Sequence, residues 1–198
     1  MISIAKTPKD AVRELAHRYD VKLSTESSNI LISMMHSERF RHRSMIMKPN
    51  DSCSTLFFIT KGLIRIYDVN EEQDEQTRDI LHEHDVLMME QCLFSDMQST
   101  FYVQTLEPTI LYGIDFTTLK ALADTHPDIN QLLYKILAQD ILQKDDYLNT
   151  LYLHPKDRYT HLLKTNSEVV RRTPLKYIAS YLRMAPETLS RVRNTMLI

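Results

Sequence analysis

The spacing of hydrophobic and polar residues changes along the chain. Residues 8–19 show helical spacing behind Thr7 and Pro8, a capping residue and a first-turn proline, and residues 27–36 predict a second helix. From about residue 39 to residue 114 the apolar runs are short and separated by turn-forming residues. They predict strands at 44–48, 56–59, 63–69, 76–81, 101–105 and 109–114. Many short strands at this spacing are typical of a β-barrel or jelly roll.

Helical spacing returns after residue 115. Asp115 is placed to cap a short helix that runs to residue 123, and residues 128–153 then form a long stretch without glycine or proline. The apolar positions of the long helix are Ile129, Leu132, Leu133, Ile136, Leu137, Ile141, Leu148 and Leu151. This is more apolar surface than packing on one barrel requires. We therefore expect a dimer helix that packs on a second copy of the chain; the alternative is a helix packed only on its own core.

Residues 176–194 predict two short helices joined by a three-residue turn. Thr173 is expected to cap the first helix, with Pro174 in its first turn and Ile178, Ala179 and Leu182 on its inner face. Pro186 begins the second helix, whose inward positions are Leu189, Val192 and Met196. This arrangement predicts a helix-turn-helix unit whose second helix enters a DNA major groove.

The polar face of this second helix carries the candidate DNA contacts. Glu187 and Arg191 are four residues apart, so both lie on one face, where an arginine can fork onto guanine and a carboxylate can accept from cytosine. We expect Glu187, Ser190 and Arg191 to read bases. We expect phosphate and positioning contacts from Arg172, Lys176, Thr188, Arg193 and Asn194. The alternative is that Glu187 and Arg191 form an ordinary surface ion pair.

The strings YIASYL (177–182) and PETLSR (186–191) resemble the C-terminal part of cyclic-AMP receptor/fumarate-nitrate (Crp/Fnr) regulators, and LFFITKGLIRIY (56–67) is similar to a segment of their barrel. In that family the residues matching Glu187 and Arg191 read base pairs. The resemblance implies an α+β fold with a jelly-roll effector domain at 1–127, a dimerisation helix at 128–153 and a winged helix-turn-helix domain at 154–198. It implies a homodimeric transcription regulator, with double-stranded DNA and RNA polymerase as partners.

Two residues of the turn depart from the family pattern. Arg183 stands where glycine is usual, at a position whose backbone is expected to be left-handed, which costs a non-glycine residue about 1 kcal/mol. Ala185 stands where a Thr or Ser cap is expected. Neither departure forbids the motif.

The charge distribution supports a polyanion partner. Residues 154–198 carry nine Lys/Arg against three Asp/Glu, a net +6, whereas residues 1–153 carry fifteen against twenty-three, a net −8. The N-terminus lacks the pattern of a signal peptide and no apolar run is long enough for a membrane span, so we expect a cytoplasmic protein without a membrane partner. The two cysteines, Cys53 and Cys92, fit a reducing compartment.

In family members that bind cyclic nucleotides, a Gly-Glu pair and a later Arg hold the ligand. Glu90, Leu93 and Phe94 match this cassette, but Met89 replaces the glycine and the arginine position falls near Ser99. No Lys or Arg occurs from residue 79 to 119, so we expect neither cyclic-nucleotide binding nor any other cofactor. An unknown, more apolar effector could instead bind in a pocket formed by Met88, Met89, Glu90, Phe101, Tyr102 and Tyr112. The alternative is that these side chains themselves fill the pocket.

A metal-dependent, cupin-like protein is the other alternative, because His82 and His84 alternate as on a strand and Glu90 follows. The spacing of the glutamate and the missing glycines argue against it, and we expect no metal site. No Ser/His/Asp or Cys/His arrangement stands out, so we expect no catalytic residues and no enzyme.

Overall fold

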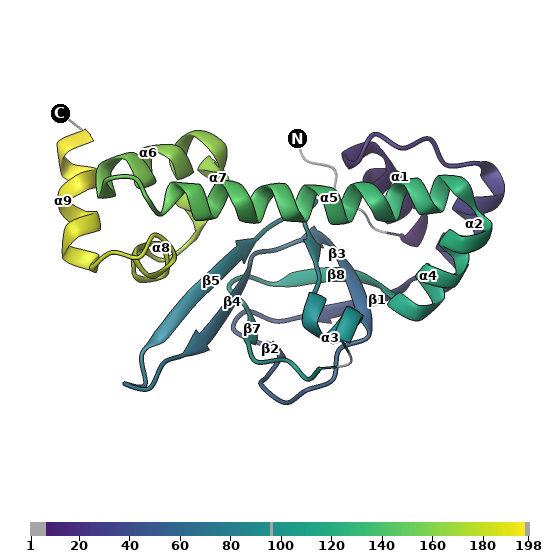
Figure 1. The fold of residues 1–198 in the computed structure, drawn as a ribbon, viewed down its shortest axis with the longest axis horizontal. Helices are drawn as coiled ribbons and strands as arrows, with labels where there is room; N and C mark the ends of the chain where they lie inside the picture. The colour runs from purple at the N-terminus through teal and green to yellow at the C-terminus, as the bar shows by residue number, and fades with distance from the viewer. Residues whose placement is uncertain (1–6, 96, 197–198) are drawn as a thin grey trace.

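The computed structural model describes residues 7–95 and 97–196 and shows an antiparallel β-barrel beneath one long helix (Figure 1). Two four-stranded sheets form the barrel, with strand orders β1-β8-β3-β6 and β2-β7-β4-β5. The strands are β1 (His36–Phe40), β2 (Met45–Met47), β3 (Thr55–Lys61), β4 (Ile64–Val69), β5 (Glu75–Leu81), β6 (Val86–Leu87), β7 (Tyr102–Thr105) and β8 (Thr109–Asp115). The predicted α+β class with a jelly roll is therefore confirmed.

Two apolar layers hold the barrel in place. Between the sheets, Phe57, Ile59, Ile64, Val103 and Leu111 pack as alternate residues of neighbouring strands turn inward. The outer layer lies between the first sheet and the helices α1 (Pro8–Arg18), α2 (Thr25–Met34), α4 (Phe116–Thr125) and α5 (Pro127–Thr150). A short helix, α3 (Glu90–Ser95), lies within the segment of the expected ligand cassette.

Gly62, in the turn from β3 to β4, adopts a φ of +113°. A Cβ atom there would lie 2.3 Å from Thr109 Oγ1, so only glycine fits this close approach of two chain segments. The turn thereby places the Gly62 amide beside the loop between β5 and β6.

The C-terminal unit, in the part that the structure describes, consists of helices and contains no strand. Its helices are α6 (Pro155–Thr165), α7 (Ser167–Arg172), α8 (Leu175–Tyr181) and α9 (Pro186–Met196). The prediction that Thr173 caps the first helix of the motif is wrong. Thr173 ends α7, and Pro174, which has no side-chain donor or acceptor, precedes α8. Among the described residues no helix is both long enough and apolar enough to cross a membrane.

Candidate nucleic-acid interface and ligand cavity

Helix α9 presents the expected base-reading residues to solvent. Leu189 is fully buried against α6 and α8, and Val192 packs beside it, which turns the opposite face of the helix outward. Glu187, Ser190 and Arg191 are all exposed on that face. Their side chains form no hydrogen bond or ion pair with residues 7–95 or 97–196, so the alternative of a Glu187–Arg191 ion pair is not formed here. The side chain of Met196 lies outside the described residues.

The turn between α8 and α9 has the expected left-handed residue. Arg183 adopts a φ of +54°, and the N–H of Met184 reaches back to the carbonyl of Ala179 at 3.0 Å, which closes the end of α8. Arg158 of α6 donates to the carbonyls of Leu182 and Arg183 at 2.9 and 3.2 Å. Sequence reasoning missed this contribution of Arg158, because its partners are 24 and 25 residues away.

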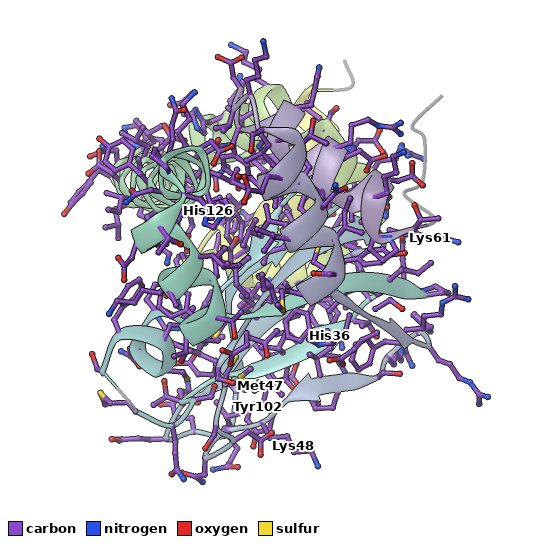
Figure 2. All side chains as sticks on the ribbon, turned by 90° about the vertical axis from the view of Figure 1, so that its right-hand side faces the viewer. His36, Met47, Lys48, Lys61, Tyr102 and His126 are labelled. Carbon is purple, nitrogen blue, oxygen red and sulfur yellow. The ribbon has the colours of Figure 1, made fainter. Side chains whose placement is uncertain are left out.

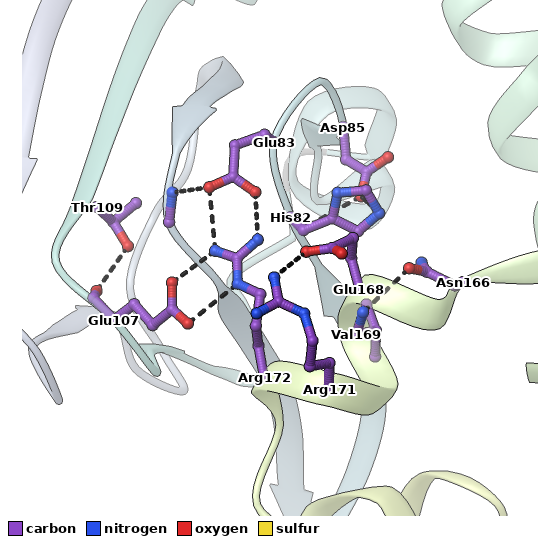
Figure 3. Close-up of polar contacts among 11 residues, drawn as sticks. His82, Glu83, Asp85, Glu107, Thr109, Asn166, Glu168, Val169, Arg171 and Arg172 are labelled. Carbon is purple, nitrogen blue, oxygen red and sulfur yellow. Dashed lines mark hydrogen bonds and ion pairs between the residues drawn. The ribbon is translucent and has the colours of Figure 1, made fainter. Parts of the chain in front are cut away.

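The residues expected to contact phosphates differ in how exposed they are. Lys176 and Asn194 are exposed, while Thr188 and Arg193 are half-buried. Arg172 differs from the expectation and is only 15% exposed. Its guanidinium lies between two carboxylates of the barrel, Glu83 and Glu107, rather than on the solvent side of the unit (Figure 3). In this conformation Arg172 is therefore not available to a phosphate.

One face of α5 is apolar but not covered by the chain. Ile129, Leu132 and Ile136 are buried on the barrel side. The exposed apolar residues of α5 are instead Tyr134, Ile141, Leu142 and Leu148, with exposures of 69, 66, 68 and 56%, and Tyr152, which is 90% exposed, follows the end of the helix. Tyr134, Ile141 and Leu148 are spaced by seven residues, the repeat of a two-helix seam. We name this row of three residues the α5 seam.

A cavity of about 430 Å³ lies between β5, α5 and the C-terminal unit, and it includes four of the six residues expected to form a pocket. Met88, Met89, Glu90 and Phe101 line it. Tyr112 is instead buried in the outer apolar layer, and Tyr102 stacks on Tyr67 at 5.0 Å in the lower part of the barrel in the view of Figure 2. The pocket is thus more charged than the sequence predicted, because Asp79, Asp140 and Lys144 also line it.

The carboxylate of Glu90 is already paired with a cation from α5. Lys144 forms an ion pair with Glu90 and another with Asp140, the latter at 2.9 Å. The hydroxyl of Ser99 is engaged in its own turn, where it donates to the carbonyl of Phe101 at 3.0 Å. Sequence reasoning missed Lys144 because it lies outside the cassette, although its spacing of four residues from Asp140 indicated a helix-surface pair.

The carboxylate of Asp79 on β5 faces the same cavity. Burial raises its pKa to about 7, and the backbone N–H of Ile80, at 2.8 Å, only partly opposes this effect. Burial likewise raises the pKa of Asp140 above its ordinary value. A carboxylate with a pKa near neutrality therefore lies between the barrel and the C-terminal unit.

The alternative metal site has no geometric basis in the described part of the chain, where no group of three or more His, Cys, Asp and Glu residues could hold an ion. His82 and His84 lie in the β5–β6 loop, and each is 3.9 Å from a carboxylate, Asp85 and Glu14 respectively. Glu90 is engaged with Lys144 instead.

Comparison with known proteins agrees with this geometry. Residues 37–126 match the model of the cyclic nucleotide-binding domain. The chain is 27% identical over 127 residues to electron transport regulator A of Shewanella oneidensis, covering 64% of the chain and 49% of that protein. Over 103 residues it is 26% identical to the fumarate and nitrate reduction regulatory protein of Yersinia pestis, covering 52% of the chain and 40% of that protein. The chain is thus similar to regulators of the Crp/Fnr type.

The solved structures extend the likeness over the described fold. FixK2 from Bradyrhizobium japonicum superimposes with a TM-score of 0.70 at 16% identity, covering 82% of this chain and 84% of that one. The chain spans about half the length of the curated relatives it matches. The resemblance inferred from YIASYL and PETLSR is thus confirmed, while the activity of the whole protein is a matter for proposal.

Proposed function

We propose that this chain is a sequence-specific, DNA-binding transcription regulator of the Crp/Fnr type. Residues 1–127 would serve as the effector domain, 128–153 as the dimerisation helix and 154–198 as the DNA-binding domain. The observation that carries the proposal is the exposed row of Glu187, Ser190 and Arg191 on α9, whose side chains are unpaired among the residues that the structure describes. Polar side chains able to read base edges are free there, on a unit with net charge +6.

Selection of duplexes from a random DNA pool, followed by titration of the selected operator, tests this proposal. Affinity is expected to fall steeply between low and physiological salt, because each phosphate contact releases counterions. Failure to enrich any sequence, or an affinity that does not change with salt, would count against it. Cyclic AMP and cyclic GMP serve as ligand controls, and we expect neither to bind, because Lys144 already holds Glu90 and Ser99 replaces the expected arginine.

The DNA reader is proposed to be a homodimer joined through the α5 seam. A two-fold dimer would offer two α9 helices to major grooves about 34 Å apart, and the seam supplies apolar surface at the correct spacing. Ile136 and Leu137 are poor test positions, because both pack on the barrel. The variant Ile141→Asp with Leu148→Asp should sediment as a monomer, since each charge would be buried at the contact. Leu163→Asp, at an exposed apolar residue of α6, is the control.

A second candidate function is that of a small-molecule sensor, and the cavity of about 430 Å³ favours it because it touches the barrel, α5 and the C-terminal unit together. A ligand bound there would contact all three parts of the chain. Screening by thermal stabilisation tests this candidate, since a ligand that binds only the folded state raises Tm.

A further inference from the structure

The outer edge of strand β5 is covered by the first helix of the helix-turn-helix. β5 is the last strand of its sheet, so one row of its backbone groups has no strand partner. The hydroxyl group of Ser180 on α8 forms hydrogen bonds with two backbone groups of this row. The N–H of Thr77 donates to Ser180 Oγ at 2.9 Å, and the hydroxyl donates to the carbonyl of Glu75 at 3.2 Å. The C-terminal unit therefore closes an edge that would otherwise be open to solvent.

A buried arginine joins the same two elements. Arg65 of β4 is 1% exposed, and its guanidinium lies 4.2 Å from the ring centre of Tyr67 and 3.9 Å from that of Tyr177 on α8. It also donates to Thr77 Oγ1 at 2.9 Å and to Glu75 at 2.5 Å. A desolvated cation between two aromatic faces is a specific and directional contact. It therefore joins α8 to the sheet through one buried side chain.

The third contact is the pairing of Arg172, at the end of α7, with two barrel carboxylates. It makes four hydrogen bonds, to Glu83 at 2.6 and 3.0 Å and to Glu107 at 3.0 and 2.5 Å (Figure 3). Glu83 is held in place by the N–H of Gly62 at 2.8 Å. Burial opposes ionisation of Glu83, yet the hydrogen bonds from Arg172 hold its pKa below the ordinary value. We name Arg172, Glu83 and Glu107 the carboxylate clamp.

We propose that Arg172 is a positioning residue: the carboxylate clamp fixes the helix-turn-helix on the edge of β5, and thereby sets the placement of α9 for DNA binding. This inference rests on the proposed function. Without Arg172, the half-buried carboxylates Glu83 and Glu107 would lose their cationic partner. Their repulsion and burial would then favour separation of the C-terminal unit from the barrel. DNA then binds only the docked fraction, so apparent affinity falls in proportion.

Two variants separate this role from a phosphate contact, because the two roles predict opposite signs. Arg172→Ala removes the cation, and Glu83→Gln with Glu107→Gln keeps the cation but weakens its hold. Under the positioning role, both variants bind the selected operator about tenfold more weakly with an unchanged salt slope. Under a phosphate role, the double variant releases Arg172 and binds at least as tightly as the wild type, while Arg172→Ala lowers the salt slope by about one unit per half-site. The second pattern, or wild-type affinity in either variant, overturns the proposal.

Matched controls exclude a general effect of charge. Arg171→Ala removes the same charge one residue earlier, where the side chain is 70% exposed and pairs only with Glu168 among the described residues. Glu71→Gln with Glu72→Gln removes two charges from the exposed β4–β5 turn. Neither control should reproduce the tenfold loss, and a control that did would overturn the positioning role.

Hydrogen exchange at the Thr77 amide gives a readout that needs no DNA. This amide is protected by Ser180, so undocking should accelerate its exchange in both clamp variants while sedimentation still shows a dimer. If the wild type binds no selected DNA, the proposed function fails, but faster Thr77 exchange would still support the clamp as the device that docks the unit. Unchanged Thr77 exchange in both variants would overturn it.

Discussion

The two helices of the helix-turn-helix differ in what surrounds their polar side chains. On α8, Tyr177 and Ser180 are turned onto the barrel, where they meet Arg65 and the backbone of β5. On α9, Glu187 and Arg191 face solvent and have no side-chain partner in the described chain. The same contrast separates two arginines: within the described part of the chain, four hydrogen bonds hold the Arg172 side chain and none holds that of Arg191.

A C-terminal unit with a net positive charge therefore does not offer its whole surface to DNA. Part of the polar surface of residues 154–198 serves to attach the unit to the barrel, and only the remainder is free to meet a polyanion. A free arginine can bind a base or phosphate without first breaking an internal pair, whereas a paired one loses contacts of comparable strength. Substitutions at the attached face should therefore affect stability, and those at the free face should affect recognition.

The largest expected effect is on stability, at Arg65. Arg65→Ala should lower the free energy of unfolding by about 2–4 kcal/mol, because it leaves a cavity between two tyrosines and removes the cation that they share. Arg191→Ala should change it by less than about 0.5 kcal/mol, as is usual for an exposed side chain. Urea unfolding of both variants measures the difference. Equal values would show that the attached and free faces are energetically alike.

The second effect concerns recognition by α9. Arg191→Ala should lose about 1–3 kcal/mol of discrimination at one position of each half-site, since the guanidinium is free to fork onto a guanine. Paired titrations on operator and scrambled duplexes give the specificity ratio. If the ratio stays at its wild-type value, α9 is not the reader, and its exposed polar row has another role.

Much of the barrel could be predicted from the sequence because its strands obey simple periodicity. All six predicted strands are found within about two residues of their expected ends. β1 was missed because its residues, His36–Phe40, are mostly polar and exposed, and β6 because it has only two residues. In the C-terminal unit, the predicted N-cap Thr173 was wrong. Threonine is a common capping residue, but here it follows the last residue of α7 instead of starting α8.

The candidate site was less predictable because its partners are distant in sequence. Arg172 meets Glu83 and Glu107 at separations of 89 and 65 residues, which no local pattern reveals. Likewise, the apolar stripe of α5 does not say which of its residues meet the barrel, and the structure buries Ile136 on the chain's own core while Ile141 is exposed. The face of α9 was predictable because one buried residue, Leu189, fixes the rotation of the helix.

A smaller effect, on pH dependence, is expected beneath α8. Asp79 has a pKa of about 7 in the folded chain, against about 3.9 in an unfolded one, so the folded state binds its proton more tightly. Stability should therefore fall as pH rises from about 4 to about 7 and then level off. Asp79→Asn should remove on the order of 1–2 kcal/mol of this fall, less than the full shift because the cavity admits solvent.

Thermal unfolding at pH 5 and pH 8 checks this expectation. Asp124→Asn, at an exposed position on α4, serves as the control and should keep the wild-type pH dependence. A wild-type protein as stable at pH 8 as at pH 5 would mean that the Asp79 carboxylate is solvated in the folded state. The buried contact between the barrel and α8 would then depend on Arg65 and Ser180, without a contribution from the Asp79 carboxyl group.

The smallest effect is expected at Lys176, which is exposed on α8 with its ammonium 4.7 Å from the ring centre of Tyr177. It belongs to the barrel-attached helix but has no barrel partner among the described residues, so it tests where the attached face ends. Lys176→Ala should weaken binding to all sequences alike, by less than about 1 kcal/mol, and reduce the salt slope by about one unit per half-site. Lys164→Ala, an exposed lysine of α6, removes the same charge and should leave the slope unchanged.

Equal salt slopes for Lys176→Ala and Lys164→Ala would mean that Lys176 acts only through its contribution to net charge. A lower slope for Lys176→Ala alone, with the wild-type slope kept by Arg172→Ala, would place the boundary between attachment and DNA contact between Arg172 and Lys176, which are four positions apart in the chain.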